Sequence, residues 1–353
     1  MLLFRCTDNS VQFWEDEKHW DISFPEKLAR TPTAAYLSWD YRYVAFGNDR
    51  GIEAGSPPGT LQPTGLHGIW VYDLQKHTLT AVPHRVQPSD VFWEASFDRN
   101  GALYYSDGNA FWRWNIGDQN PERLFKFQRV KGAPMGMAVN ANGDHIAYYK
   151  FKSDERRFHL YDIRTDNDQD LKFSIYHFGW LDDTHIAWTR SGGLKLLDIE
   201  SGKSTLLLKN YQSIMKKCNK ADAELLSPFT KFESIDVFED LDVLGFCEDR
   251  IMFILRLFSP KSASSRIANF LNKKPQGTKH SGIWSVALTG KDVRFHFPVP
   301  SNYKNSFYTG WDHSSNCLRW IDKEQVLQLW DGQKQKFFPA GWMPVFMPED
   351  CWG

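Results

Sequence analysis

The sequence predicts an all-β protein, a single seven-bladed β-propeller made of four-stranded antiparallel blades. Three observations predict this fold: a short alternating segment that recurs along the chain, a second hairpin pattern ahead of most copies, and strand sets at the two ends that complement each other. Side chains of a strand alternate between its two faces with a period of two, and this period excludes a solenoid of helix pairs.

The recurring segment is a run of alternating apolar residues that ends at an acidic or small polar residue. Its copies are VQFWE, IWVYD, FWRWN, FHLYD, LKLLD, IWSVA and LQLWD, and they end at Glu15, Asp73, Asn115, Asp162, Asp198, Ala287 and Asp331. Several copies continue through a polar turn into another strand, as in DIESGKSTLLL and DGQKQKFF, which is typical of a hairpin. These copies predict one blade each.

A second hairpin pattern lies upstream of most copies, in YLSWDYRYVAF, ASFDRNGALYY, MAVNANGDHIAYY, FGWLDDTHIAW and YTGWDHSSNCLRW. Together the two patterns give each repeat unit four strands. The step from Asp198 to Ala287 is longer than the others, which leaves eight blades as an alternative. We favour seven, because residues 209–231 and 258–281 have the composition of insertions around one ordinary blade.

The two ends of the chain are expected to share one blade. Residues 2–24 supply three strands, and GWMPVFM near the C-terminus supplies the missing one. Joining them removes an open sheet edge that would otherwise invite aggregation. We therefore expect one propeller domain over residues 1–353, with insertions at 48–67, 209–231 and 258–281.

Composition is that of a folded protein without a strong preference for charged partners. Hydrophobic residues make up 42 % of the 353 residues, and the net charge is −1, so no global field favours nucleic acid or anionic lipid. Arg5 and Asp8 interrupt the apolar run that a secretory signal needs, and five scattered cysteines lack CxxC spacing. We expect a cytoplasmic protein with reduced thiols, no membrane contact and a monomeric state.

Three short segments carry a resemblance to known propeller repeats. They are residues 96–101 (SFDRNG), residues 160–162 (LYD) and residues 329–331 (LWD). In these segments, and in the repeat that covers nearly the whole chain, the sequence resembles TolB-type and WD-repeat-like propellers. The Gly-His dipeptides of typical WD repeats are absent. The resemblance implies the architecture and leaves the function open, because scaffolds, receptors and enzymes share these repeats.

Motifs that would identify an enzyme are absent from the sequence. There is no GxSxG for a serine nucleophile, no HExxH or Cys/His cluster for a metal, and no GK[ST] ending in the glycine-rich residues 51–68. Peptidases that carry a propeller attach a separate α/β domain, whereas the blades use up this chain. The sequence predicts no catalytic residue, metal site or cofactor.

The long connections are expected on one face of the propeller. If the strands of each blade are labelled A to D outward, residues 48–67, 150–157 and 258–281 are B–C connections and residues 209–231 are a D–A connection. Long loops gathered on one face predict a binding surface. Two of them flank one blade and are rich in basic residues, namely Lys216, Lys217, Lys220, Lys261, Arg266, Lys273, Lys274 and Lys279.

Candidate partner-binding residues follow from this placement. Large aromatics, Met and Arg dominate the energetics of many interfaces. Near the channel mouth these are Trp93, Arg129, Met135, His177, Tyr303 and Trp342, and on the basic insertion they are Arg266, Lys273 and Lys274. The competing interpretation of each aromatic residue is packing between blades, and that of His177 is a structural or solvent-facing side chain.

The leading functional hypothesis is a non-catalytic platform that binds a protein partner through its loop-rich face. An inhibitor or immunity role and a scaffold role both fit it, and the local basic patch leaves nucleic acid as a lesser option. The alternative is an enzyme, a hydrolase or lyase, or a carbohydrate-binding propeller, with its site in the central channel.

Overall fold

The computed structural model describes most strands and the shorter turns of the chain. The described residues are 2–7, 10–15, 18–24, 34–47, 68–83, 95–107, 110–126, 135–152, 155–175, 177–190, 193–209, 211–218, 238–247, 249–260, 277–300, 303, 309–312, 315–322, 324, 326–340 and 342–346. They form two compact units, one of Met1–Ile175, Lys323–Leu327 and Phe338–Trp352, the other of Tyr176–Asp322 and Gln328–Phe337. Within the described residues, no helix is long and apolar enough to cross a membrane.

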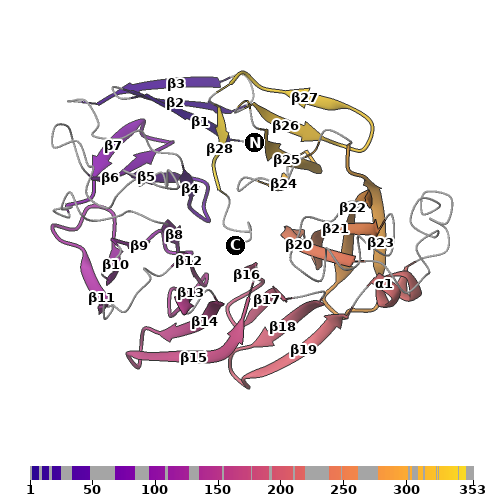
Figure 1. Ribbon diagram of the computed structural model, residues 1–353. Coiled ribbons are helices and arrows are strands. Elements are labelled where there is room, and N and C mark those ends of the chain that lie inside the picture. The colour runs from indigo at the N-terminus through magenta and orange to yellow at the C-terminus, as the bar shows by residue number, and fades with distance from the viewer. Residues whose placement is uncertain are drawn as a thin grey trace. The chain divides into compact units, whose positions relative to one another are not determined.

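The first unit contains four sheets of four antiparallel strands, in each of which neighbouring strands lie side by side (Figure 1). Blade 1 has the order β28 (Met343–Pro344), β1 (Leu2–Cys6), β2 (Ser10–Glu15), β3 (Lys18–Ser23). Blade 2 is β4 (Ala35–Leu37), β5 (Tyr43–Gly47), β6 (Ile69–Asp73), β7 (Thr78–Ala81). Blade 3 is β8 (Ala95–Phe97), β9 (Leu103–Ser106), β10 (Ala110–Trp114), β11 (Glu122–Lys126). Blade 4 is β12 (Met135–Val139), β13 (His145–Lys152), β14 (Glu155–Asp162), β15 (Asn167–Ser174).

The second unit contains blades 5 and 6 and most of blade 7. Blade 5 is β16 (Phe178–Trp180), β17 (His185–Arg190), β18 (Gly193–Asp198), β19 (Lys203–Leu208). Blade 6 is β20 (Phe238–Cys247), β21 (Arg250–Pro260), β22 (Gly277–Ala287), β23 (Val293–Pro298). Blade 7 is β24 (Gly310–Asp312), β25 (Cys317–Ile321), β26 (Leu327–Trp330), β27 (Gln335–Phe337). These seven sheets confirm the predicted fold class, a seven-bladed β-propeller.

Blade 1 joins the two ends of the chain, as the sequence predicts. Phe4 pairs with Met343 and Leu3 with Pro344, so β28 covers the edge of β1. The chain then continues to blade 2, where the Phe346 oxygen accepts from the Leu37 nitrogen at 2.9 Å. The rings of Tyr36 and Phe346 stack with their centroids 5.5 Å apart. The C-terminal segment therefore ties two blades together, a contact the sequence pattern did not predict.

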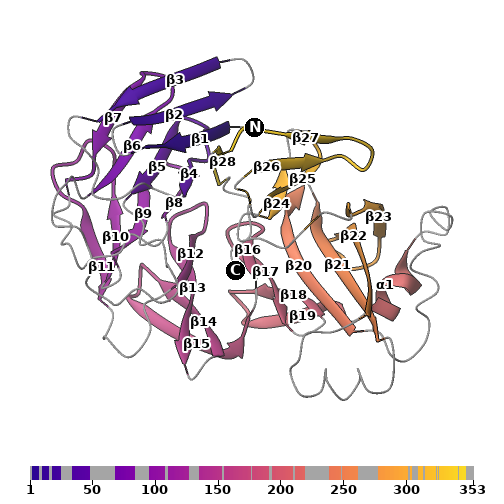
Figure 2. The same cartoon turned by 45° about the horizontal axis from the view of Figure 1, so that its top comes forward.

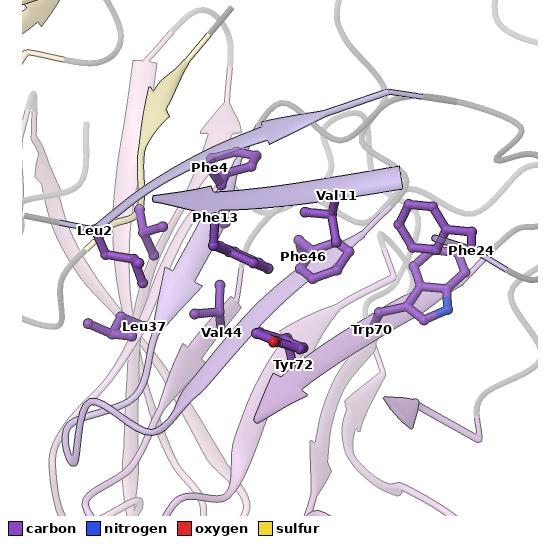
Figure 3. Close-up of a cluster of buried hydrophobic side chains, with 12 residues drawn as sticks. Leu2, Phe4, Val11, Phe13, Phe24, Leu37, Val44, Phe46, Trp70 and Tyr72 are labelled. Carbon is purple, nitrogen blue, oxygen red and sulfur yellow. The ribbon is translucent and has the colours of Figure 1, made fainter. Parts of the chain in front are cut away.

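A continuous apolar core fills the space between blades 1 and 2 (Figure 3). The period of two directs Val11 and Phe13 of β2 to the same face, and both are fully buried. Phe13 stacks on Tyr72 of blade 2 with the ring centroids 5.1 Å apart. The remaining members of this core are Leu2, Phe4, Phe24, Ala35, Leu37, Val44, Phe46, Trp70 and Val345.

The aspartate that ends the recurring segment shapes the turn that follows it. Oδ1 of Asp73 accepts hydrogen bonds from the backbone nitrogens of Gln75 and Lys76, at 2.9 and 3.0 Å. The aspartate at the same position of the repeat does the same in three other blades. Its Oδ1 accepts hydrogen bonds from two backbone nitrogens at Asp162, Asp198 and Asp331. Such side-chain caps explain why the repeat ends at Asp.

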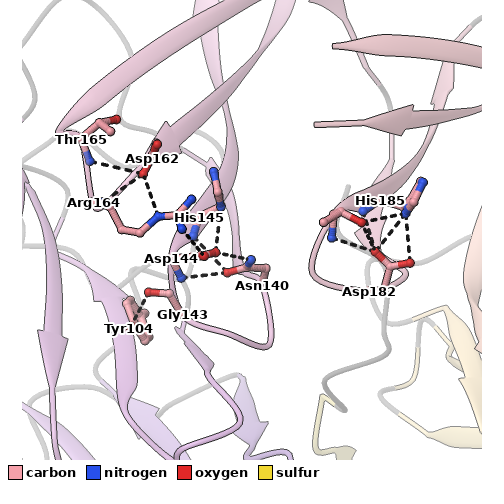
Figure 4. Close-up of polar contacts among 11 residues, drawn as sticks. Tyr104, Asn140, Gly143, Asp144, His145, Asp162, Arg164, Thr165, Asp182 and His185 are labelled. Atoms are coloured by element: carbon pink, nitrogen blue, oxygen red, sulfur yellow. Dashed lines mark hydrogen bonds and ion pairs between the residues drawn. The ribbon is translucent and has the colours of Figure 1, made fainter. Parts of the chain in front are cut away.

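The A–B turns of several blades use the same device. Asn140 Oδ1 accepts the backbone nitrogens of Asp144 and His145, each at 3.0 Å (Figure 4). Asp182 caps the backbone nitrogens of Thr184 and His185 in the same manner, each at 2.7 Å. The polar residues between the two apolar runs of these hairpin patterns thus cap tight turns.

The predicted long connections are only partly within the described residues. Residues 48–67 and 261–276 lie outside them, as do residues 210 and 219–231. Residues 150–157 are not a long loop: β13 and β14 pair through this region as far as Lys152 and Glu155. Part of the 258–281 insertion is also strand, because β21 and β22 pair as far as Pro260 and Gly277. At both places the backbone pairing of the two strands continues beyond the strand ends that the sequence predicts.

The segment after β19 forms a helix, α1 (Tyr211–Lys217), within the predicted insertion 209–231. Cys218 then pairs in parallel with Val293 of β23. The Lys217 ammonium donates to the Leu207 carbonyl oxygen at 2.8 Å, so this basic residue of the predicted patch has a structural contact.

Asp168 links three strands of blade 4 through its carboxylate. It accepts hydrogen bonds from Tyr148 Oη at 2.7 Å and Lys150 Nζ at 3.0 Å, and His159 Nδ1 lies 3.2 Å from its Oδ1. Burial would raise the pKa of Asp168, but the hydrogen bonds from His159, Tyr148 and Lys150 outweigh it and lower the pKa to about 2. The ionised carboxylate is the form that the blade stabilises.

Deletion of residues 341–353 tests the shared blade. It removes β28 and Val345, and burying a valine side chain alone contributes about 1.5–3 kcal/mol. We expect the free energy of unfolding to fall by about 3 kcal/mol or more in denaturant titrations. The matched control deletes residues 347–353 and keeps the pairing of β28 and Phe346. Equal stability of the two truncated proteins would contradict the closure.

The Asp168→Asn variant tests the polar link in blade 4. Because folding lowers the pKa of Asp168, its stabilisation is complete above the unfolded value of about 3.9 and is lost as pH falls through about 2. We expect the Tm of the variant to be lower than that of the parent protein at pH 7. The difference in Tm should become smaller as the pH falls from about 3.9 to about 2. Asp170→Asn, at an exposed position of the same strand, is the control. A difference in Tm that stays constant with pH would refute this role.

Candidate functional site

Five of the predicted partner-binding residues lie outside the described residues, so their role stays a prediction. They are Trp93, Arg129, Arg266, Lys273 and Lys274. Met135 begins β12, where its backbone is paired with Tyr149 ahead of an irregularity in the ladder. At this irregularity Gly136 has a φ of +64°, and a Cβ there would lie 2.1 Å from the Tyr149 ring, so only glycine fits.

Two further predicted residues are packed into the interior. Tyr303 is 6 % exposed and meets Trp320 edge-on, with ring centroids 5.6 Å apart. Trp342 is 7 % exposed and meets Trp14 edge-on at the same separation, 5.6 Å. These contacts correspond to the packing interpretation. Whether either side chain also binds a partner stays a prediction.

His177 is the predicted residue that the structure brings together with other ionisable groups. It comes directly before β16, and its Nε2 lies 2.9 Å from Oδ1 of Asp242 in β20. The His177 side chain is 28 % exposed, whereas that of Asp242 is 11 % exposed. A partly exposed imidazole therefore rests against a buried carboxylate, at the contact between blades 5 and 6 within the second unit.

The strand register of blade 5 places His177 on a defined face. Phe178 pairs with Trp188, and the Thr189 nitrogen donates to the His177 oxygen at 2.9 Å, so Thr189 is opposite His177. Cross-strand neighbours share a face, and the period of two adds Gly179 and Ala187 to it. Strand β17 of blade 5 is in contact with β20 of blade 6, and β20 carries Asp242.

A buried arginine holds the other oxygen of the same carboxylate. Arg256 Nη2 forms an ion pair with Asp242 Oδ2. Asp242 is paired with Ile254, so Arg256, two residues further along β21, is its diagonal neighbour on the same face. Figure 2 shows β20 and β21 running side by side. Arg256 is only 2 % exposed, and buried charges need such a partner because desolvation of an isolated one is costly.

The three side chains define a directional hydrogen-bond arrangement, here named the His177 triad (His177, Asp242, Arg256). A carboxylate only accepts, so Nε2 of His177 carries the hydrogen, and the lone pair of the neutral imidazole is on Nδ1. Arg256 fixes the carboxylate, and the carboxylate fixes the orientation and tautomer of the ring. This arrangement equips an imidazole to take up a proton and stabilises the imidazolium that results.

Thr189 adds a buried hydroxyl beside the triad. It is 1 % exposed, and among the described residues its Oγ1 has no hydrogen-bond partner. A buried hydroxyl without a partner destabilises a fold by about 1–3 kcal/mol, so native proteins retain few of them. Its position opposite His177 places this hydroxyl on the face of blade 5 that carries the imidazole.

Sequence reasoning found His177 but missed Asp242, Arg256 and Thr189. The first two lie within the long step between Asp198 and Ala287, where the repeat was hardest to follow. A usable signal was present: FEDLDVLGF and RIMFILRLF are apolar strands interrupted by charged residues of opposite sign. A charge at a buried strand position predicts a partner, although it does not say which one.

The described part of the chain brings together no group of three or more His, Cys, Asp or Glu side chains that could hold a metal ion. No family model matches the sequence. No curated protein matches it either.

Solved structures do resemble the chain over nearly its whole length. An oligogalacturonate lyase in complex with manganese has a TM-score of 0.55 and 9 % identity, covering 95 % of this chain and 83 % of that one. The oligogalacturonate lyase of Vibrio parahaemolyticus has a TM-score of 0.55 and 6 % identity, with coverages of 96 % and 85 %. A prolyl endopeptidase has a TM-score of 0.53 and 8 % identity, with coverages of 98 % and 49 %. At these identities the likeness establishes the fold alone.

The comparisons correct the leading functional hypothesis from the sequence. A non-catalytic interaction platform was the wrong preference, because these structural neighbours are lyases and an endopeptidase, that is, enzymes. They favour the alternative, an enzyme or carbohydrate-binding propeller. The preference for a platform rested on the long connections expected on one face and on the absence of linear motifs. A site assembled from separate blades leaves no such motif in the sequence.

Double-mutant analysis tests the energetics of the buried ion pair. Asp242→Asn and Arg256→Met should each lower the free energy of unfolding by about 3–5 kcal/mol, because each leaves a buried charge without its partner. The double variant should lose clearly less free energy of unfolding than the sum of the two single losses, because neither buried charge remains in it. Denaturant titration of the four proteins measures this coupling. Additive losses would show that the two groups do not interact in the folded protein.

Proposed function

We propose that the protein is an enzyme, a lyase or hydrolase acting on a carbohydrate, in which His177 transfers the proton. The observation that carries the proposal is the His177 triad, a partly exposed imidazole held by a buried carboxylate that is itself held by a buried arginine. A general base must be accessible to substrate and held in one orientation, and the partly exposed, anchored imidazole of His177 meets both conditions.

The comparisons support a carbohydrate lyase over a peptidase. This chain covers 83 % and 85 % of the two oligogalacturonate lyase chains, but only 49 % of the prolyl endopeptidase chain. A fold shared over most of both chains permits the same location of the site. About half of the prolyl endopeptidase chain lies outside the match, and the functional groups of that half have no counterpart in the residues compared.

The chemistry of a uronide lyase is within reach of one imidazole. Nδ1 of neutral His177 removes the hydrogen on the carbon beside the sugar carboxylate. The electron pair of that C–H bond forms a carbon–carbon double bond, and the adjacent bond to the glycosidic oxygen breaks. The departing sugar oxygen then takes a proton from His177 or from water. In a hydrolase the same nitrogen would instead remove a proton from the attacking water.

The negative charge of Asp242 favours the imidazolium that forms during the first step. Arg256 keeps this carboxylate ionised and fixed, which reduces the reorganisation needed as the proton moves. One similar lyase structure contains manganese. The described residues of this chain form no cluster that fits a metal ion, and no step of the proposal involves one.

Activity assays with the full chain test the proposal. The substrates are oligogalacturonate and a panel of neutral and acidic oligosaccharides, and the readouts are the ultraviolet absorbance of the new double bond and the release of reducing ends. We expect turnover by the parent protein and a loss of about 10²–10⁴-fold in kcat for His177→Ala. His185→Ala, which changes a partly exposed histidine at the first residue of β17 in the same blade, should keep full activity.

Two results would overturn the proposal. One is binding of a carbohydrate without any turnover, which would make the protein a carbohydrate-binding propeller. The other is turnover that His177→Ala and His185→Ala affect equally, which would place the chemistry elsewhere.

A further inference from the structure

We infer that Asp98, Tyr104 and Gly143 form a proton-dependent latch between blades 3 and 4, here named the Asp98 latch. Its hydrogen bonds are complete only when the Asp98 carboxyl carries a proton. Asp98 follows β8 and Tyr104 is on β9, both in blade 3, whereas Gly143 is on the turn between β12 and β13 of blade 4. Both blades belong to the first unit. The inference concerns the response of the fold to pH and is independent of the proposed enzymatic role.

The phenol oxygen of Tyr104 is close to two other oxygen atoms at the boundary between the blades. Tyr104 Oη is 3.3 Å from Asp98 Oδ2 and 3.0 Å from the Gly143 carbonyl oxygen (Figure 4). Gly143 has a φ of +74°, and a Cβ there would lie 2.5 Å from Asp98 Oδ2, so this close approach requires glycine. Asp98 and Tyr104 are both buried.

The charge state of Asp98 sets the number of hydrogens available for these two contacts. A phenol carries one hydrogen, and a backbone carbonyl oxygen can only accept. The shorter separation favours donation from Tyr104 to Gly143. With Asp98 ionised, no hydrogen is then left between Oδ2 and the Tyr104 oxygen. A protonated Oδ2 supplies that hydrogen, and Tyr104 Oη accepts it while it donates to Gly143.

Blade 4 has a neutral counterpart of Asp98 at the same place in its own A–B turn, Asn140. Oδ1 of Asp98 accepts hydrogen bonds from two backbone nitrogens of its turn, at 3.0 and 2.9 Å, as Oδ1 of Asn140 does. The other polar atom of Asn140, Nδ2, donates to Asp144 Oδ1 at 2.6 Å. A protonated Oδ2 of Asp98 is the carboxyl equivalent of this donor. The turn therefore accommodates a neutral side chain that accepts through one atom and donates through the other.

Burial favours the protonated form of Asp98. Desolvation raises the pKa of Asp98 and outweighs the hydrogen bonds from the two backbone nitrogens and Tyr104 and the charge of Arg113, which lower it. The guanidinium of Arg113, on β10, is itself paired with Glu122 of β11. Because folding raises the pKa of Asp98, the stabilisation from its proton is complete below the unfolded value of about 3.9 and is lost as pH rises through the folded value. The latch thus closes in acid.

The first experiment compares the parent protein with Asp98→Asn by thermal unfolding across a pH series. The amide introduced at position 98 can donate to Tyr104 at every pH, and it carries no charge. We expect the Tm of the variant to exceed that of the parent by about 2 °C or more at pH 7. The difference should vanish as the pH falls to about 3.9, where the parent itself carries the proton.

The matched control is Asp182→Asn, which changes the cap of the corresponding turn in blade 5. The Asp182 side chain is exposed, and hydrogen bonds from Thr184 and His185 outweigh its partial desolvation and lower its pKa. Because folding lowers this pKa, the ionised form is the stabilised one. The Tm of Asp182→Asn should therefore be equal to or lower than that of the parent at pH 7, the opposite sign to Asp98→Asn.

The second experiment separates the latch from the simple removal of a buried charge. In a Tyr104→Phe background the amide at position 98 loses its acceptor, so the gain in Tm from Asp98→Asn at pH 7 should be smaller than in the parent. If Tyr104 instead donates to an ionised Asp98, the gain should be larger in this background. In the parent, Asp98→Asn would then also lose a charge-assisted hydrogen bond.

Four results would overturn the inference. They are a lower Tm of Asp98→Asn than of the parent at pH 7, failure of this variant to fold, a difference in Tm that does not change with pH, and a larger gain in the Tyr104→Phe background. None of these measurements involves catalysis. Absence of turnover would overturn the proposed function and leave the decision on the Asp98 latch unchanged.

Discussion

The repeated geometry of the blades depends on one small interaction, the capping of tight turns by a side-chain oxygen. The chain must reverse direction between strands of only a few residues without losing buried backbone hydrogen bonds. Such short strands form too few hydrogen bonds to compensate for a turn of the wrong geometry. In three C–D turns the fourth residue after the capping aspartate, His77, Asp166 or Gly202, has a φ of 54°, 52° or 65°. The aspartate stabilises a turn whose backbone would otherwise be strained at non-glycine residues. The capped turn fixes the register of the two strands that it joins. The register in turn determines the face of the sheet on which each side chain of these strands lies.

Much of this could be predicted from the sequence, because the signal is local and repeated. The recurring aspartates, the alternating apolar runs and the complementary ends each depend on residues close together in the chain, or on a simple count of strands. The prediction is wrong where strand pairing continues into polar residues. The composition of residues 150–157 predicts a connection, yet Lys150 pairs with Arg157, because backbone hydrogen bonding between strands does not require apolar side chains.

The candidate site could be predicted only in part for a physical reason. His177 was singled out from its position before a first strand, but its partners come from a different blade. Asp242 reaches His177 through the contact between blades 5 and 6, and the ion pair of Asp242 depends on a diagonal relation between β20 and β21. A sequence pattern gives the face of each residue within its own strand. It does not give the distance between two strands of neighbouring blades.

The pairing of β28 with β1 also sets an order of events during synthesis. Strands β1 to β3 are made before the partner of β1, Met343–Pro344, and the residues of the other six blades lie between them in the chain. Until then β1 presents an unpaired edge, and Phe346 has not yet bonded to blade 2. Contacts of such long sequence separation form slowly. Blade 1 is thus complete only after the residues of the other six blades have been made, and during that interval the edge of β1 is open to pairing with another chain.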